Sequence, residues 1–187
     1  RVLFRSQRLD RRLGREIVGA YCGDAVKRRR HRGKHDVGQR DGRWRAAEAL
    51  EIGLVSLGWL DSVQETQSGH FRPIGSNGFY TRGGGRADFD QQPVEAQAMV
   101  SACLEASHAT GDSAWSRSAR RAFEWFLGRN DLGMALYDAG NGGCADGLHA
   151  DRINENQGAE STLAFHLSLA KMKLAELPII AVSGDAK

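Results

Sequence analysis

The sequence has few cysteines, few prolines and no long hydrophobic run. Its three cysteines, Cys22, Cys103 and Cys144, are widely spaced and odd in number, which fits neither a disulfide framework nor a zinc site. No apolar stretch approaches the length of about 18 residues that a membrane-spanning helix needs. The first residues are also not followed by the apolar segment that a secretory signal would have. With 187 residues, of which 41% are hydrophobic, we expect one soluble domain in the cytoplasm.

The first 45 residues differ sharply in charge from the rest. They hold 15 of the 26 Lys and Arg residues but only 5 of the 23 Asp and Glu residues. The cluster KRRRHRGKH at 27–35 would neutralise phosphates, but it lacks the interleaved aromatic residues or helical motif that give nucleic-acid specificity. The opening RVLFRS resembles a translated sequencing adapter, and the first residue is not Met. We interpret residues 1–43 as a non-native or disordered basic segment; a native helix and a nucleic-acid-binding arm are the alternatives.

Four segments place apolar residues at steps of three and four, the spacing of one helix face. This pattern predicts helices at 44–64, 93–110, 114–127 and about 158–177. Asp112 or Ser113 is suited to cap the third helix, so residues 93–127 are predicted to form two antiparallel helices joined by a tight turn. Trp59 and Trp125 sit at helical spacing and are assigned to the core. The last helix carries one apolar stripe: Leu163, Leu167, Ala170 and Leu174.

Two polar, glycine-rich loops separate these helices, at 67–92 and 128–157. Loops this long in a compact domain are usually functional or disordered, and their aromatic and paired acidic residues favour function. We expect the first loop to carry a short β-hairpin around residues 76–78, where Ser-Asn-Gly is suited to a tight turn.

The loops occupy equivalent places in an internal repeat of helix, long loop, helix, short turn and helix. Repeated helical hairpins of this kind close into a toroid or stack into a solenoid, with all long loops on one face. We therefore expect the two loops to face the same space and to hold the site. The equivalent pairs are Gln92 and Gln157, Glu95 and Glu160, each 65 positions apart, and Trp59 and Trp125, 66 apart.

Three stretches carry a resemblance to a known family: GHFRPIGSNGFYTRGGGRADFDQQPVEA at 69–96, the segment 109–131 containing RRAFEWFLGRND, and GGCADGLHADRINENQGAESTLAF at 142–165. They resemble the C-terminal part of bacterial proteins described as glycosyltransferases, in the six-hairpin glycosidase-like group. The resemblance covers roughly residues 44–174. It implies an (α/α)-toroid and a sugar or polysaccharide substrate, although the same fold hosts hydrolases, lyases and epimerases. The earlier hairpins of that family are absent before residue 44.

Four residues are candidates for catalysis. Asp88 and Asp90 flank one residue and would point the same way in an extended segment, as a paired acid and base for glycosidic chemistry. The alternative is that one of the two caps the following helix or closes a turn against Arg86. Asp146 and His149 form a second possible acid–base pair, in a loop whose glycines let backbone approach a ligand.

The candidate substrate-binding residues come from both loops and the helix starts that follow them. Arg72 suits a carboxylate or phosphate on a sugar, and aromatic rings give flat faces for sugar stacking. Glu95 and Glu160 also fit the acidic position of a helix capping box. The full set is His70, Arg72, Phe79, Tyr80, Gln92, Glu95, Asn156, Gln157 and Glu160.

The sequence thus predicts an all-α, incomplete (α/α)-toroid with two functional loops and a short β-hairpin, spanning residues 44–177 and followed by a tail at 178–187. Its expected function is binding or processing of an oligosaccharide; a non-catalytic recognition or scaffold domain, or an inactive fragment, is the alternative. We expect no cofactor, and the glycines at 83–85 lack the context of a phosphate loop. We expect no metal, because the His and Cys residues do not have metal-ligand spacing. Expected partners are a glycosyltransferase domain or missing N-terminal hairpins, since an incomplete toroid leaves helix faces unburied and prone to self-association.

Overall fold

A computed structural model describes residues 40–81 and 83–176. Of the basic segment predicted at 1–43, residues 1–39 lie outside these residues, as does the tail at 178–187. Residues 40–43 belong to a helix, which therefore begins before the predicted start at 44. The first described helix, α2, spans Arg40–Val63. The chain divides into two compact units between Gly58 and Trp59, so residues of α2 belong to both. In the first unit its apolar side chains Leu50 and Ile52 are exposed. The second unit contains both long loops and the three helices that follow α2.

The predicted pair of antiparallel helices is confirmed. Helix α3 spans Pro93–Thr110 and α4 spans Ser113–Glu124. Gly111 ends α3 in the left-handed conformation and donates its N–H to the carbonyl of Ser107, a conformation that costs glycine little. Asp112 then caps α4, because its carboxylate accepts the N–H of Ala114 at 2.8 Å. Proline at the start, glycine at the end and an aspartate cap therefore set these boundaries.

The polypeptide continues as one 3-10 turn, η2 at Trp125–Leu127, which ends at Gly128. Helix α5 spans Ala159–Glu176, close to the predicted limits. The fully buried Trp125 and Phe126 form the centre of the core with Phe165 of α5. The rings of Phe126 and Phe165 meet edge to face at 5.5 Å, and Tyr137 stacks on Phe165 at 4.0 Å. Trp125 is in the core as predicted.

One prediction about burial is wrong. Trp59 is not a core residue: 41% of it is exposed, and its ring stacks on Tyr80 instead. The α5 apolar stripe also lies on the exposed side, with Leu163 59% and Leu174 66% exposed. The buried face of α5 is a second stripe, in which three of the five residues are small. Its buried residues are Ser161, Ala164, Phe165, Ser168 and Met172.

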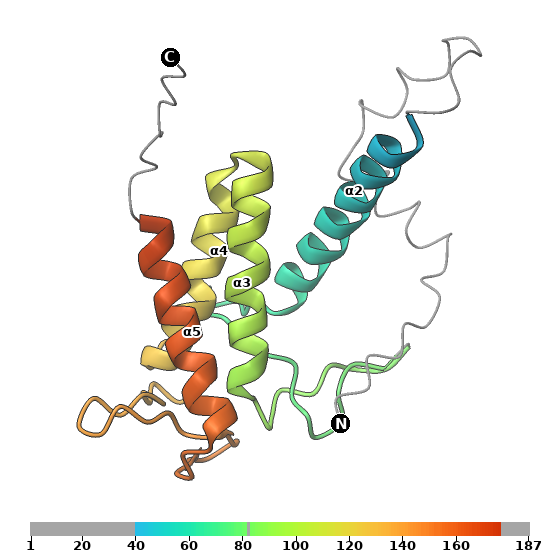
Figure 1. Cartoon of the computed structure of the whole chain (residues 1–187). Helices are drawn as coiled ribbons and strands as arrows, with labels where there is room; N and C mark the ends of the chain where they lie inside the picture. Colours follow the sequence, from blue (N-terminus) through green and yellow to red (C-terminus); the bar gives the residue numbers. More distant parts are fainter. Residues whose placement is uncertain (1–39, 82, 177–187) are drawn as a thin grey trace, which may run out of the picture. The chain divides into compact units, whose positions relative to one another are not determined.

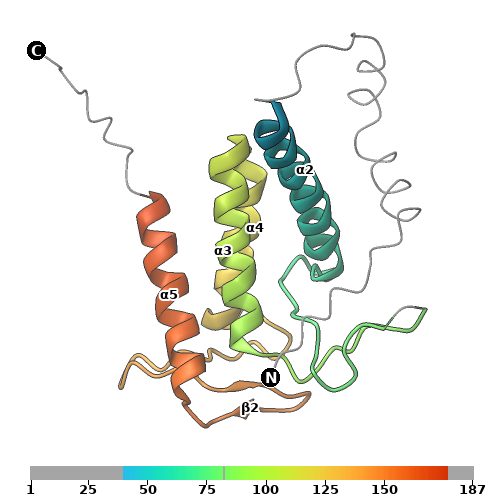
Figure 2. The same cartoon turned by 45° about the vertical axis from the view of Figure 1, so that its right-hand side comes forward.

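In Figure 1 and Figure 2, α3, α4 and α5 lie side by side, and the long loops gather at the end where α3 and α5 begin. The only two-stranded sheet of the described residues joins β1 (Gly147–Leu148) and β2 (Ile153–Asn154) in the second loop. Residues 76–78 form a turn, closed by the N–H of Phe79 on the carbonyl of Gly75 at 3.0 Å, but the hairpin lies farther along the chain, where Tyr80 pairs with Arg86. The described part is thus mostly helical, and it contains no helix long and apolar enough to cross a membrane.

Candidate functional site

The two long loops meet through a backbone pairing. Gln91 donates its N–H to the carbonyl of Leu148, and Leu148 donates to the carbonyl of Gln91, both at 2.9 Å. The pairing is antiparallel and adds Gln91 to the edge of β1 that faces away from β2. The prediction that the loops share one space is confirmed at this point. Both Gln91 and Leu148 are buried, so their neighbours in each strand face the other way.

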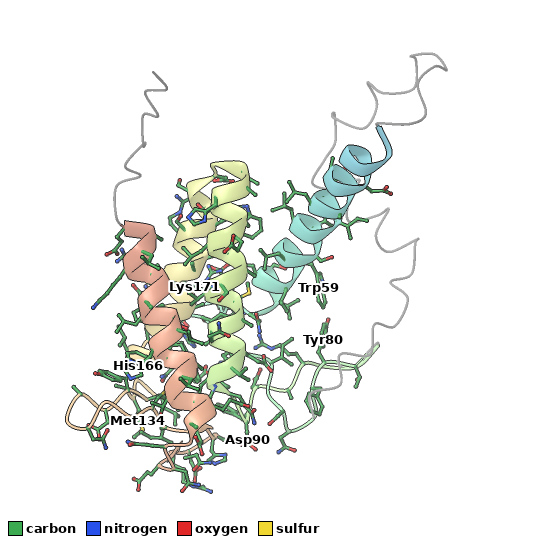
Figure 3. The ribbon with its side chains drawn as sticks, in the orientation of Figure 1. Trp59, Tyr80, Asp90, Met134, His166 and Lys171 are labelled. Atoms are coloured by element: carbon green, nitrogen blue, oxygen red, sulfur yellow. The ribbon has the colours of Figure 1, made fainter. Side chains whose placement is uncertain are left out.

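Those neighbours are Asp90 and His149. Since Gln91 lies opposite Leu148, the antiparallel register places Asp90 opposite His149. The imidazole Nδ1 and the carboxylate Oδ1 are 2.5 Å apart, and both side chains are partly exposed, 30% for His149 and 41% for Asp90. Figure 3 shows Asp90 at the loop end of the helices. A carboxylate bonded to Nδ1 orients the ring and leaves Nε2, on its far edge, to exchange a proton with a ligand.

The predicted pairing of Asp146 with His149 is wrong. Asp146 accepts the backbone N–H of Gly158 at 2.7 Å, so its charge lies where α5 begins, a favourable place for an anion. The two residues are three positions apart in an extended segment and therefore project to opposite sides. Asp146 anchors the second loop to α5, and the partner of His149 is Asp90 from the first loop.

Asp88 and Asp90 contact different groups. Asp88 forms ion pairs with Arg86 at 2.8 Å and with Arg72 at 3.1 Å, whereas Asp90 bonds to His149. The turn against Arg86, the alternative for Asp88, is therefore what the structure shows. The expectation that the two carboxylates point together as one acid–base pair is not met, because each side chain turns to its own basic partner.

A buried ionic cluster lies beneath the loops, centred on Asp131. Its carboxylate accepts hydrogen bonds from Arg72 Nε to both oxygens at 2.9 Å, from His70 Nε2 at 3.0 Å and from Gln91 Nε2 at 2.5 Å. Burial alone would raise the pKa of Asp131, but the bonds from Arg72, Gln91 and His70 outweigh it and lower the pKa. The guanidinium of Arg72 has a raised pKa, chiefly through its bond to Asp131.

This cluster changes the roles predicted for His70 and Arg72. Both side chains bond to Asp131, and His70 Nδ1 also contacts Ser68 Oγ at 2.9 Å. They therefore hold the first loop to a residue just after η2, and the expectation that Arg72 faces a ligand anion is wrong. The sequence pattern gave no reason to single out Asp131 or Gln91, because their contacts join positions distant along the chain.

The predicted equivalence of Glu95 and Glu160 is only partial. Glu160 is exposed in the first turn of α5, as a solvated helix-start acid would be. Glu95 is half-buried and accepts the backbone N–H of Ile74 at 3.1 Å and the Gln64 amide at 3.4 Å. Burial raises the pKa of Glu95 to about 7, although the bond from Ile74 opposes the shift. Glu95 is thus a link between α3 and the first loop.

The other amide candidates lie at the loop margins. Gln92 Nε2 is 3.5 Å from Ser76 Oγ, and Gln157 Oε1 accepts from Asn141 at 3.0 Å. Asn156 is exposed, and its carbonyl accepts the N–H of Asp146 at 2.8 Å. Gln157 and Asn156 thus keep exposed side chains in the second loop, and Gln92 is half-buried near the first.

Two aromatic candidates are exposed in the first loop. Phe79 is 63% exposed and adopts a positive φ of 56°. Tyr80 is 43% exposed and stacks on Trp59, with ring centroids 5.9 Å apart and planes 20° from parallel. Figure 3 shows the labelled rings of Trp59 and Tyr80 beside each other. Trp59, assigned to the core from its spacing, belongs with the exposed aromatic residues that can contact a ligand.

Two further kinds of chemistry would need a reactive thiol or a metal site among the described residues. Burial raises the pKa of both Cys103 and Cys144 to about 12, so each thiol stays protonated and is a poor nucleophile at neutral pH. Among residues 40–81 and 83–176, no group of three or more His, Cys, Asp or Glu side chains is arranged to hold a metal ion.

Comparison with known proteins adds no assignment. No protein-family model matches the chain, and no curated protein sequence is significantly similar to it.

Proposed function

We propose that the face where the two loops meet binds an oligosaccharide and that the Asp90–His149 pair transfers a proton there. One observation carries this proposal: a carboxylate and an imidazole from two different loops, 59 positions apart in the sequence, lie 2.5 Å from each other and remain partly exposed. A structural ion pair needs no such access to solvent. A general acid–base pair does, because it must reach the proton that it moves.

A partial (α/α)-toroid is the architecture that we propose for this mostly helical fold. Helix α3 packs against both α4 and α5, and the loops before α3 and α5 emerge at the same end, as they would in such a repeat. The exposed α5 apolar stripe is the face that a further helical hairpin of such a repeat would cover, whether from the same protein or from a glycosyltransferase domain. The resemblance of the loop motifs supplies the substrate class.

The geometry favours proton transfer over hydrolysis by two carboxylates. Glycoside hydrolysis uses two carboxyl groups on either side of the bond. Here Asp88 is engaged by two arginines and Asp146 by the start of α5, which leaves the Asp90–His149 pair as the accessible acid–base group. The reaction class that fits is proton transfer to or from a sugar oxygen or a carbon beside a carboxylate.

A second function is non-catalytic recognition of a glycan. The observation that favours it is the exposed stack of Trp59 on Tyr80, with Phe79 next in the chain. Exposed aromatic faces such as these, from α2 and the first loop, can bind the apolar faces of sugar rings without any chemistry. This alternative predicts that the aromatic residues control affinity and that Asp90 and His149 do not matter.

The test is calorimetric titration of the full chain with mannose-, glucose- and uronate-containing oligosaccharides, followed by assay for altered product. We expect His149→Gln and Asp90→Asn to abolish turnover with little loss of binding, and Tyr80→Ala to weaken binding about tenfold, the loss of one good contact. Asp151→Asn is the matched control, because Asp151 is an exposed carboxylate two residues from His149 that pairs with Arg152. Binding that survives every change without turnover would favour recognition alone, and no binding of any sugar would refute both functions.

A further inference from the structure

We propose that Asp131 is the positioning residue for the Asp90–His149 pair, acting through the side chain of Gln91. This inference rests on the function proposed for that pair. The side chain of Asp131 is only 8% exposed, and its hydrogen bonds go to His70, Arg72 and Gln91 rather than to the pair itself. Its influence therefore has to pass through one of these three side chains.

Gln91 is the side chain that connects the two places. Its Nε2 donates to Asp131 Oδ2 at 2.5 Å and to the carbonyl of Asp88 at 2.9 Å. Its Oε1 accepts from the indole Nε1 of Trp125 at 2.7 Å. Both the nitrogen and the oxygen of this fully buried amide are thus engaged, and the amide is held in one orientation.

The backbone of Gln91 carries the constraint to the site. Its N–H and carbonyl form the two bonds to Leu148 that set the register between the loops. Asp90 precedes Gln91 and His149 follows Leu148, so a slip or a widening of this pairing separates the carboxylate from the imidazole. We infer that the side-chain amide of Gln91, held at both its nitrogen and its oxygen, prevents this slip.

The negative charge of Asp131 strengthens the hydrogen bonds that hold the Gln91 side chain in place. Hydrogen bonds to an ionised carboxylate are roughly twice as strong as neutral ones, and here three side chains donate to it away from water. A neutral amide cannot replace this carboxylate. An asparagine side chain in its place would turn an NH2 donor toward either Arg72 or Gln91, both of which are donors themselves.

The first experiment measures Asp131→Asn by NMR in the full chain, without sugar. We expect amide hydrogen exchange of Leu148 to accelerate at least about tenfold relative to the Val100 amide in the core of α3. We also expect the 15N signal of His149 Nδ1 to move, because its bond to Asp90 lengthens or is lost. The Val100 reference removes any change in global stability, so an effect confined to Leu148 and His149 supports a positioning role.

Asp61→Asn is the matched control. Asp61 is another part-buried carboxylate of the second unit, bonded to Arg121 at 2.6 Å and to Ser118 at 2.8 Å. The variant loses an ion pair of the same kind, but Asp61 has no bond to Gln91. We expect its Leu148-to-Val100 exchange ratio and its His149 signal to match those of the unmodified chain.

If Asp131→Asn does not fold, Gln91→Met decides the question, because methionine has a similar volume and no amide. The same changes at Leu148 and His149 are then expected. Unchanged Leu148 exchange and an unchanged His149 signal in a folded variant would overturn the proposal. Because this experiment contains no sugar, that result would leave the proposed function standing. If instead the chain binds no glycan but its variants show these NMR changes, the proposed function is refuted and the positioning role of Asp131 is retained.

Discussion

The carboxylate of Glu95 accepts the backbone N–H of Ile74 at 3.1 Å, which ties the first turn of α3 to the first long loop. The same oxygen lies 3.4 Å from the amide of Gln64, whose Oε1 is buried and has no hydrogen-bond partner among the described residues. Burial raises the pKa of Glu95 to about 7. This link between helix and loop therefore changes its charge near neutral pH.

The first prediction concerns the pH dependence of stability. A carboxyl whose pKa is about 7 when folded and about 4.3 when unfolded favours folding at low pH. Its contribution is full below about pH 4.3 and is lost as the pH rises to about 7. Glu95→Gln keeps an acceptor for Ile74 but does not ionise. We expect equal urea stability of the two proteins near pH 4 and a gain for the variant of about 2 kcal/mol at about pH 8.

Glu160→Gln is the control for this prediction, because Glu160 also lies in the first turn of a helix but is exposed. We expect the Glu160→Gln protein to have no greater urea stability than the unmodified chain at about pH 8. A pH-independent difference between the Glu95→Gln protein and the unmodified chain would contradict the assigned burial of Glu95.

A second prediction concerns Gly147, at the pairing of the two loops. A Cβ atom there would lie 2.7 Å from the carbonyl oxygen of Gln91, which is closer than real Cβ contacts. We expect Gly147→Ala to cost about 1–3 kcal/mol of unfolding free energy and to loosen the Asp90–His149 pair. Gly85→Ala is the control, since a Cβ at Gly85 meets nothing within 4 Å. Equal urea midpoints for the two variants would be the contrary result.

A third prediction concerns the cap of α4. The carboxylate of Asp112 accepts the N–H of Ala114 at 2.8 Å. Asp112→Ala removes this acceptor and is expected to cost about 1 kcal/mol, measured by urea unfolding, whereas Asp112→Asn retains an acceptor and should cost a few tenths. A loss of the same size in both variants would mean that the charge, and not the cap, is what stabilises the turn.

A fourth prediction concerns the α5 apolar stripe, whose leucines are more than half exposed. Exposed apolar stripes promote association, so we expect the sedimentation coefficient of the chain to rise with concentration. Leu163→Gln combined with Leu167→Gln should restore monomeric behaviour with a change in stability within about 0.5 kcal/mol, because exposed side chains contribute little to the core. Lys173→Gln, on the same helix, should leave the association intact. A chain that is monomeric at all concentrations would contradict the prediction.

The helices could be predicted from sequence because their signals are local. Pro93 and Gly111 mark the two ends of α3, Asp112 caps α4, and the spacing of apolar residues identifies each helix. The meeting of the two loops also followed from their equivalent places in the repeat. These features depend on residues that are near one another in the chain or recur at a fixed period.

The site itself could be predicted only in part, because its contacts depend on which loop residues face each other. Asp90 and His149 were both candidates, but each was assigned to the wrong partner, since alternation along a strand separates His149 from Asp146. Helix α5 has two possible inner faces, and periodicity does not tell which one packs. Asp131 forms hydrogen bonds to residues up to 61 positions away, and no local sequence pattern predicts such contacts.

The pairing of Gln91 with Leu148 encloses all of α3 and α4 in a single closed segment of chain. Closing a segment of that length costs conformational entropy that two hydrogen bonds cannot offset alone. We therefore expect the helical hairpin to form first and bring the two ends together, so that Asp90 and His149 come into contact late in folding. A proteolytic nick at the turn between α3 and α4 would remove this covalent tether, and the site would then persist only through the packing of the two halves.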